Sequence, residues 1–385
     1  MKTHYSKNLD SIPPSGIRRF FDLIGDSENI LSLGIGEPHF GTPECIKKAG
    51  IRTLEKGITS YTSNNGLLAL REEITNYLSR RFSIHYSPKN EIIITTGVSE
   101  GADIALRAIL NPDDEVIFPD PGYVCYPALI ALAGGKCISV DTSETDFIPT
   151  KNAIQNAITS KTKAIILCSP SNPTGAVIPK KRLVEIASLA KEHDLWIISD
   201  EIYAELTFDA PYTSIASIPE MKERTIVLSG FSKAFSMTGW RLGYIAGPES
   251  IVTRTLKIHQ YATLCAPIMA QYAGIEALQS ALSDVKRMTA FYKERRNQFI
   301  TGLREIGYDV GMPSGAFYCF PSIKKTNLSS EDFCIALLQE EKLATVPGSA
   351  FGKFSEGFIR CCYATTKDVI DDALNRLNRF YKNHT

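Results

Sequence analysis

Short apolar segments of β type alternate with helical segments from about residue 90 onward, and this alternation constrains the fold more than any other feature. The first pair is the run Glu-Ile-Ile-Ile-Thr-Thr at residues 91–96, followed by a helical segment to about Leu110. The strands of a parallel sheet are nearly continuous apolar runs, because helices cover both faces. The pattern therefore predicts an α/β fold with a mostly parallel sheet. Further strands are expected at residues 115–119, 136–140, 164–168, 196–199, 225–228 and 242–246.

The pattern changes after about residue 275, where long charged helices replace the alternation. Helices are expected at residues 284–303 and 368–381, with short strands between them. Pro13 and Pro14 break any helix near the start of the chain. We therefore expect three parts, which are an N-terminal arm at 1–15, a large domain at 46–274, and a small α+β domain formed by 16–45 plus 275–385.

Charge balance and cysteine content indicate which partners and which cellular compartment to expect. The 42 lysines and arginines equal the 42 aspartates and glutamates, so no net field attracts nucleic acid or an anionic membrane. The nine cysteines contain no CxxC pair, and their odd, scattered count does not suggest a disulfide framework. No apolar stretch approaches the ~18 residues needed to span a bilayer, and no signal-peptide pattern begins the chain. We expect a cytoplasmic protein with small-molecule partners and, because HExxH spacing is absent, no metal site.

The segment Gly-Val-Ser-Glu-Gly at residues 97–101 matches the GxSxG pattern between a strand and a helix, where serine hydrolases carry their nucleophile. Asp200 and His259 could complete the order serine, acid, histidine after Ser99. The same turn can instead be a plain helix cap, or it can present free backbone amides to a phosphate group. The motif alone leaves these three interpretations open.

Two later segments have no role in a hydrolase, namely Asn-Pro-Thr-Gly at 172–175 and Ser-Lys-Ala-Phe-Ser-Met-Thr-Gly-Trp-Arg at 232–241. With Ser-Asp-Glu-Ile-Tyr at 199–203, they closely resemble class I aminotransferases of the aspartate aminotransferase superfamily, fold type I. The resemblance runs from Gly-Ile-Gly-Glu-Pro at 34–38 to residues 360–365, so it covers nearly the whole chain. Within the superfamily, the sequence resembles the archaeal and bacterial aspartate or aromatic aminotransferases.

This resemblance implies a large and a small domain and a reaction that depends on pyridoxal 5'-phosphate. The expected reaction moves the amino group of an L-amino acid, aspartate or aromatic, to 2-oxoglutarate. It would follow a ping-pong mechanism through pyridoxamine phosphate. The partners implied are amino acids, 2-oxo acids and a second copy of the chain.

The resemblance also implies a role for each residue around the cofactor ring. Lys233 matches the lysine that holds the cofactor as a Schiff base and then moves the α-proton. Asp200 matches the carboxylate that keeps the pyridine nitrogen protonated. Tyr203 and Asn172 match residues that hydrogen-bond the phenolic oxygen of the cofactor, and Tyr123 matches a ring stacked on the pyridine. Lys233 and Asp200 are therefore the expected catalytic residues.

The anionic groups of cofactor and substrate have matching residues as well. Tyr61 matches a tyrosine that reaches the phosphate of the neighbouring subunit, which implies a homodimer with shared active sites. Arg360 matches the arginine that binds the substrate α-carboxylate, near a backbone contact from Gly36 and the side chains of Asn172 and Tyr123. The residues expected at the phosphate are Gly97, Val98, Ser99, Ser232, Arg241 and Tyr61.

Two alternatives remain beside an aminotransferase. Another fold type I enzyme, such as a cysteine-S-conjugate β-lyase, a decarboxylase or an aminocyclopropane-carboxylate synthase, uses the same cofactor cradle. A non-catalytic regulator with this fold normally carries an added DNA-binding domain, for which this chain has no room. The side chain of the amino donor is not fixed by the matched residues, because they contact groups that all amino acids share. Arg18 or Arg19 could contact that side chain.

Overall fold

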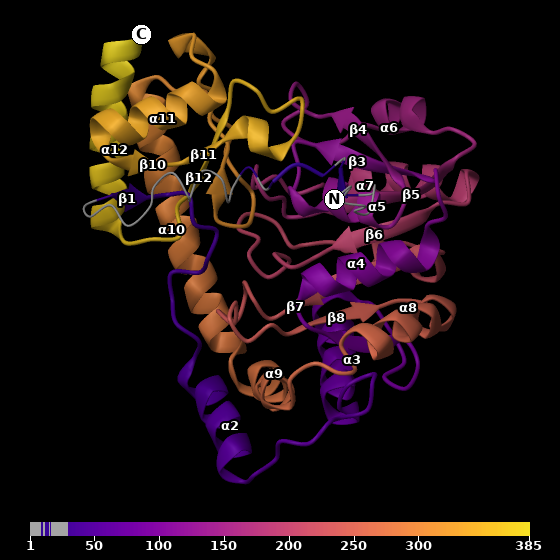
Figure 1. The fold of residues 1–385 in the computed structure, drawn as a ribbon. Helices are drawn as coiled ribbons and strands as arrows, with labels where there is room; N and C mark the ends of the chain where they lie inside the picture. The colour runs from indigo at the N-terminus through magenta and orange to yellow at the C-terminus, as the bar shows by residue number, and fades with distance from the viewer. Residues whose placement is uncertain (1–8, 11, 15, 17–29) are drawn as a thin grey trace, which may run out of the picture.

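A computed structural model describes residues 9, 10, 12–14, 16 and 30–385 of the chain. Arg18 and Arg19, either of which could contact the donor side chain, lie outside the described residues, as does most of the expected N-terminal arm. A seven-stranded sheet in the order β2-β8-β7-β6-β5-β3-β4 forms the centre of the larger part of the molecule (Figure 1).

All seven strands expected from the sequence are present, and each lies within two residues of its expected bounds. The strands are β2 (Ile92–Thr95), β3 (Glu115–Asp120), β4 (Lys136–Asp141), β5 (Thr162–Cys168), β6 (Trp196–Asp200), β7 (Thr225–Gly230) and β8 (Gly243–Ala246). Only β8 runs against its neighbours, pairing antiparallel with β2 and β7, while the other strands of this sheet are parallel. The predicted α/β class with a mostly parallel sheet is confirmed.

Alternate side chains of each strand enter different apolar clusters, as the period of two in a β-strand requires. Ile93 packs on one face of the sheet, and Ile92 and Ile94 pack on the other. The first face is covered by α4 (Val98–Ile109), α5 (Cys125–Leu132) and α8 (Glu249–Ala262). The opposite face is covered by α3 (Leu68–Phe82), α6 (Lys151–Ala157), α7 (Lys180–Glu192) and α9 (Ile268–Ser280). Helices on both faces explain why the strands are continuously apolar.

The C-terminal part contains a small antiparallel sheet in the order β11-β12-β9, flanked by long helices (Figure 1). Its elements are β9 (Tyr318–Cys319), β11 (Val346–Pro347), β12 (Ile359–Cys362), α10 (Leu282–Ile306), α11 (Ser330–Glu341) and α12 (Lys367–His384). The helices expected at 284–303 and 368–381 correspond to α10 and α12. One apolar cluster contains Ala273 and Phe299, on either side of the expected boundary at 275. The proposed domain limits therefore stay a prediction.

The remaining elements connect these two parts. A short parallel pair joins the N-terminal segment to the C-terminal part, through β1 (Leu31–Ser32) and β10 (Leu343–Ala344). The helix α2 (Glu44–Glu55) packs on α9. Four short 3-10 helices lie within residues 30–385, namely η2 (Ile215–Ser217), η3 (Lys222–Arg224), η4 (Lys324–Thr326) and η5 (Gly348–Phe351).

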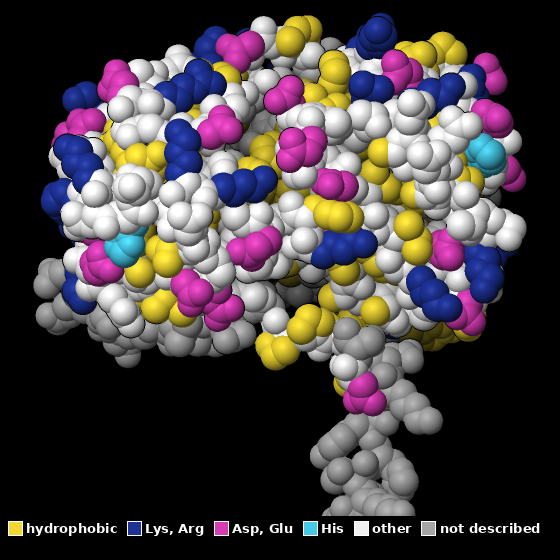
Figure 2. Space-filling view, turned by 90° about the horizontal axis from the view of Figure 1, so that it is seen from above, with side chains coloured by type: hydrophobic (Ala, Val, Ile, Leu, Met, Phe, Trp, Pro, Cys, Tyr) yellow, Lys and Arg dark blue, Asp and Glu magenta, His cyan; other side chains and the backbone are white. Residues whose placement is uncertain are grey.

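Surface charge and helix hydropathy are unremarkable for this architecture. Lysine and arginine side chains are interspersed with aspartate and glutamate on the face shown in Figure 2. None of the helices in the described part of the chain is long and apolar enough to cross a membrane.

The features that point to function lie at one edge of the large sheet. The carboxyl ends of β2, β3, β5, β6 and β7 meet there, at the edge where β8 begins, and ligands of open α/β sheets bind at such an edge.

Candidate active site

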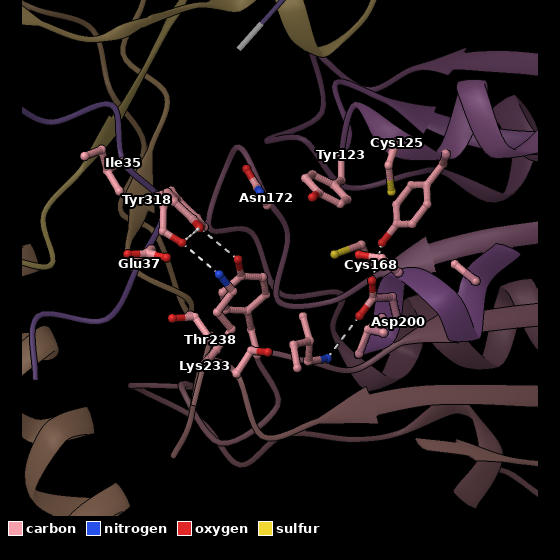
Figure 3. Close-up of a pocket in the computed structure, with 18 of the residues that line it drawn as sticks. Ile35, Glu37, Tyr123, Cys125, Cys168, Asn172, Asp200, Lys233, Thr238 and Tyr318 are labelled. Carbon is pink, nitrogen blue, oxygen red and sulfur yellow. Dashed lines mark hydrogen bonds between the residues drawn. The ribbon is translucent and has the colours of Figure 1, made fainter. Parts of the chain in front are cut away.

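A cavity of about 450 Å³ lies at this edge, between the sheet and the C-terminal part. Figure 3 shows Glu37 and Tyr318 on one side and Tyr123 and Asp200 on the other. Two of the thirteen predicted site residues, Gly97 and Tyr61, do not line the cavity. The other eleven do, and they are Gly36, Val98, Ser99, Tyr123, Asn172, Asp200, Tyr203, Ser232, Lys233, Arg241 and Arg360.

Gly97 lies directly behind the cavity, at the start of α4. Its φ of +82° is in the left-handed region that favours glycine, and a Cβ there would lie 2.7 Å from Nη2 of Arg241. The missing side chain thus lets the Arg241 guanidinium lie against the first turn of α4. Amides in the first turn of a helix have no carbonyl partner within the helix, and they carry partial positive charge. With Arg241 beside them, Val98 and Ser99 form a surface suited to an anion.

Asp200 ends β6 and is buried beneath the cavity. Its carboxylate accepts a hydrogen bond from the Tyr126 hydroxyl and another from the Ile202 amide, whose nitrogen lies 3.1 Å from Oδ1. Burial raises the pKa of Asp200 to about 6, and the Tyr126 hydrogen bond opposes that rise. The sequence did not identify Tyr126, although it follows Tyr123 by three residues and packs edge to face against its ring at 5.6 Å.

Lys233 follows β7 on a turn, and its amine reaches across the cavity to the N-terminal loop. Nζ donates to the Gly36 carbonyl oxygen at 2.8 Å. Burial is the main cause that lowers the pKa of Lys233 to about 8. The Tyr318 hydroxyl donates to the same carbonyl at 3.3 Å and shares a hydrogen bond of 2.8 Å with the Tyr203 hydroxyl. No role for Tyr318 was predicted from the sequence.

Arg360 lies on β12 with 2% of its surface exposed. Its Nη1 donates to Oδ1 of Asn172 at 3.0 Å and its Nη2 to the Gly34 carbonyl at 2.5 Å, while Nε has no hydrogen-bond partner among the described residues. The guanidinium lies 4.8 Å from the Tyr318 ring and 5.0 Å from the Phe351 ring. No described carboxylate forms an ion pair with it. Since an unpaired buried charge is costly, the arginine is suited to bind an anion that enters the cavity.

The geometry of a serine hydrolase is not present. His259 is fully buried, and its Nδ1 is hydrogen-bonded to Oε1 of Glu100 at 2.6 Å. Asp200 is bound by Tyr126. The cavity is lined by Ser99 but not by His259, so the serine, acid and histidine do not form a chain of hydrogen bonds. The turn at 97–101 is left with the helix-cap and anion-binding interpretations.

Comparison with known proteins identifies the family. The sequence profile of the family described as "Aminotransferase class I and II" matches residues 28–377, most of the chain. The chain belongs to this family. A putative aminotransferase of Bacillus subtilis, YugH, is 54% identical to this aminotransferase over 99% of both chains.

Solved structures agree with this assignment. An aromatic aminotransferase from Pyrococcus horikoshii is 42% identical, with a TM-score of 0.91 over 95% of this aminotransferase and 99% of that chain. An aspartate aminotransferase from Thermus thermophilus, crystallised with maleate, is 34% identical, with a TM-score of 0.93 over 98% and 100% of the two chains. The fold type I class and the resemblance stated from the sequence are confirmed. The roles of the individual site residues stay predictions.

Proposed function

We propose that this aminotransferase binds pyridoxal 5'-phosphate in the cavity and moves the amino group of aspartate or an aromatic amino acid to 2-oxoglutarate. One observation carries this proposal. Lys233, Arg241 and Arg360 all line the cavity, and none of them forms an ion pair with a carboxylate of the described residues. Such a site suits a ligand set with a phosphate, an aldehyde and a carboxylate, because each arginine can bind one of the two anions and the neutral form of the lysine amine can attack the aldehyde.

The cradle fits this cofactor by the chemistry of its donors. Arg241 and the first turn of α4, with Ser99 and the nearby Ser232, would hold the phosphate. Asp200 would face the ring nitrogen, with Tyr126 keeping its carboxylate in place. Bound pyridoxal phosphate supplies an aldehyde and an electron-withdrawing ring that stabilises negative charge at the α-carbon of the substrate.

Lys233 would do two things with its amine. Since its pKa is lowered to about 8, about a tenth of the amine is neutral at pH 7 and able to attack an aldehyde, far more than for an ordinary lysine. The same amine can act first as a base that accepts the α-proton of the substrate and then as an acid that gives a proton back. Its hydrogen bond to the Gly36 carbonyl, and the hydroxyls of Tyr318 and Tyr203 beside it, would keep the amine directed at the cavity.

Arg360 would bind the α-carboxylate of every substrate. Its fork is already oriented by Asn172 and Gly34, and its Nε has no partner. The side chain of the donor would meet a lining that is apolar or neutral at Ile35, Tyr123 and Tyr318. Among the described residues, Lys233, Arg241 and Arg360 are the lysine and arginine side chains that line the cavity.

The proposal includes a homodimer with shared active sites. Tyr61 is 82% exposed and Tyr261 is 88% exposed, which is unusual for large aromatic side chains. The two segments lie together, because Asn64 Nδ2 donates to the Leu264 carbonyl at 2.8 Å. A second copy packed on this surface would cover both rings and would place Tyr61 near the neighbouring phosphate.

A cytoplasmic location is supported by the cysteines, since all nine are free thiols.

A donor panel tests the proposal. The protein, loaded with pyridoxal phosphate, would be assayed with 2-oxoglutarate and phenylalanine, tyrosine, tryptophan, aspartate, alanine or lysine, with glutamate formation as the readout. We expect kcat/KM for an aromatic amino acid or aspartate to exceed that for lysine by about 100-fold or more, since pocket contacts set such ratios. Equal rates for all donors would contradict the substrate assignment, and ammonia or carbon dioxide without glutamate would favour a lyase or a decarboxylase.

A further inference from the structure

The acid inside the 97–101 motif, Glu100, has a role that neither a hydrolase nor the cofactor contacts above explain. Its side chain is 12% exposed and lies in the first turn of α4, next to the proposed phosphate site. Oε2 accepts hydrogen bonds from both the amide and the hydroxyl of Thr96, with the amide nitrogen at 2.5 Å. Oε1 bonds Nδ1 of His259 at 2.6 Å and accepts from the Thr263 hydroxyl at 2.9 Å. Glu100 thus ties the turn before α4 to the end of α8.

The position of Thr96 connects Glu100 to the anion-binding surface formed by Val98, Ser99 and Arg241. Thr96 immediately precedes Gly97, whose left-handed backbone brings the chain against the Arg241 guanidinium. The Thr95 hydroxyl also donates to the Gly97 carbonyl, at 2.9 Å. A phosphate bound by the first amides of α4 needs those amides at fixed positions, because hydrogen-bond strength falls steeply with misalignment.

His259 gives the carboxylate a rigid partner. The imidazole is fully buried on α8, and its Nε2 has no hydrogen-bond partner among the described residues. The only described contact of this ring with an acid is therefore the one to Glu100. Hydrogen bonds from His259 and Thr96 lower the pKa of Glu100 to about 2 against the opposing effect of burial, so the carboxylate is ionised at neutral pH.

We propose that Glu100, held by His259 and Thr263, is a positioning residue that fixes the Thr96-Gly97 turn for the phosphate of the cofactor. This inference rests on the proposed function, because it needs a phosphate at the first turn of α4. Glu100 acts through the backbone and does not line the cavity. Its effect should therefore be confined to ligands that carry a phosphate.

Glu91 provides a matched control at the opposite end of β2. Its carboxylate also accepts from the amide four residues earlier, that of Ser87 at 2.6 Å, and its side chain is similarly buried, with 15% exposed. It pairs with Lys222 instead of a histidine. Glu91→Ala removes the same type of contact from the turn that precedes β2, whereas Thr96 follows β2 next to the proposed phosphate site.

The experiment compares the dissociation constants of pyridoxal phosphate and pyridoxal, which lacks the phosphate, for cofactor-depleted protein. We expect Glu100→Ala to weaken pyridoxal phosphate binding by about tenfold or more and to leave pyridoxal binding within about twofold. Glu91→Ala should leave the ratio of the two constants unchanged. Glu100→Gln should recover part of the loss, because its amide oxygen can still accept from the Thr96 amide.

Three results would overturn parts of this account. Equal weakening of both ligands by Glu100→Ala, or no weakening of either, would show that Glu100 does not position the phosphate site. An equal effect of Glu91→Ala on the ratio would lead to the same conclusion. A wild-type protein that binds pyridoxal and pyridoxal phosphate equally would remove the proposed phosphate site itself, and with it this inference.

Discussion

The two walls of the cavity are built in different ways. On the sheet side, Ser99, Asp200 and Lys233 each lie within three or four residues of the end of a buried strand. On the opposite side, Gly36 meets Tyr318 across 282 residues of sequence, and Arg360 meets Gly34 across 326. The sheet register fixes the first wall, whereas long-range contacts between a loop and the C-terminal part fix the second.

This difference separates the two proposed tasks of the enzyme. The first wall, on the sheet side, carries the residues proposed to hold the cofactor, which must stay in place through every cycle. The second wall carries the residues proposed to bind the substrate, which must enter and leave. We therefore expect substrate binding to draw the second wall toward the sheet, as in enzymes that close on their ligands. Mutations in the two walls should then have separable effects.

The largest effect is expected at Lys233, where both tasks meet. Lys233→Ala removes the proposed nucleophile and the proton carrier together, so turnover should fall by at least about 10⁴-fold. The absorbance of the lysine-bound cofactor should be lost as well. Lys222→Ala, just before the other end of β7, should keep both signals. A Lys233→Ala protein that still turns over and still shows this absorbance would refute the assignment.

A smaller and more selective effect is expected at Arg360. Arg360→Ala should lower kcat/KM by about 100-fold or more, because removing one partner of a buried charge pair typically costs about 2–5 kcal/mol and would leave the substrate carboxylate unpaired. Cofactor affinity should change little, since Arg360 lies on the second wall. Arg360→Lys should recover only part of the loss, because an ammonium cannot form a fork. Steady-state kinetics and cofactor titration together check this, and a loss of cofactor with unchanged KM would break the distinction between the walls.

The smallest effect is expected in the pH dependence of cofactor capture by the Lys233 amine, which lies between the two walls. The rate at which cofactor-depleted protein captures pyridoxal phosphate should rise about fivefold from pH 7 to pH 8 and about tenfold by pH 9, where it levels off, because only the neutral Lys233 amine attacks an aldehyde. Burial lowers the pKa of this amine to about 8, so it loses its proton in that range. An ordinary lysine, with a pKa near 10.4, would give a rate still rising between about pH 9 and pH 10. Stopped-flow absorbance distinguishes the two profiles.

The sequence predicted the first wall better than the second. Strand positions follow from short apolar runs, and the run before Asp200 placed that residue at the end of a strand. Lys233 follows the end of β7 by three residues, and its predicted role came from the family resemblance. The contacts that orient these residues were not predicted. Tyr126 reaches Asp200 across 74 residues, and His259 reaches Glu100 across 159. Nothing local in the sequence marks such pairs, because they depend on which helices pack on which strand ends.

The motif at 97–101 also shows that long-range contacts cannot be predicted from local sequence. From the sequence, its serine suggested a hydrolase and its turn suggested a phosphate site. The segments at 172–175 and 232–241 favoured the phosphate site, and the tertiary structure adds the position of the histidine. His259 is turned toward Glu100 and away from any role with Ser99, so the histidine that could have completed a triad instead supports the turn. The orientation of the reversed strand β8, which brings Arg241 to the same edge, also required the structure.

The central claim is that the cavity transfers an amino group through a cofactor attached at Lys233. The most direct measurement incubates the protein, loaded with pyridoxal phosphate, with a preferred donor amino acid and no acceptor, and quantifies the products by mass spectrometry. We predict about one equivalent each of pyridoxamine phosphate and the matching 2-oxo acid per chain, as half of a ping-pong reaction requires. Unchanged pyridoxal phosphate, or continuous release of ammonia or carbon dioxide, would contradict the claim.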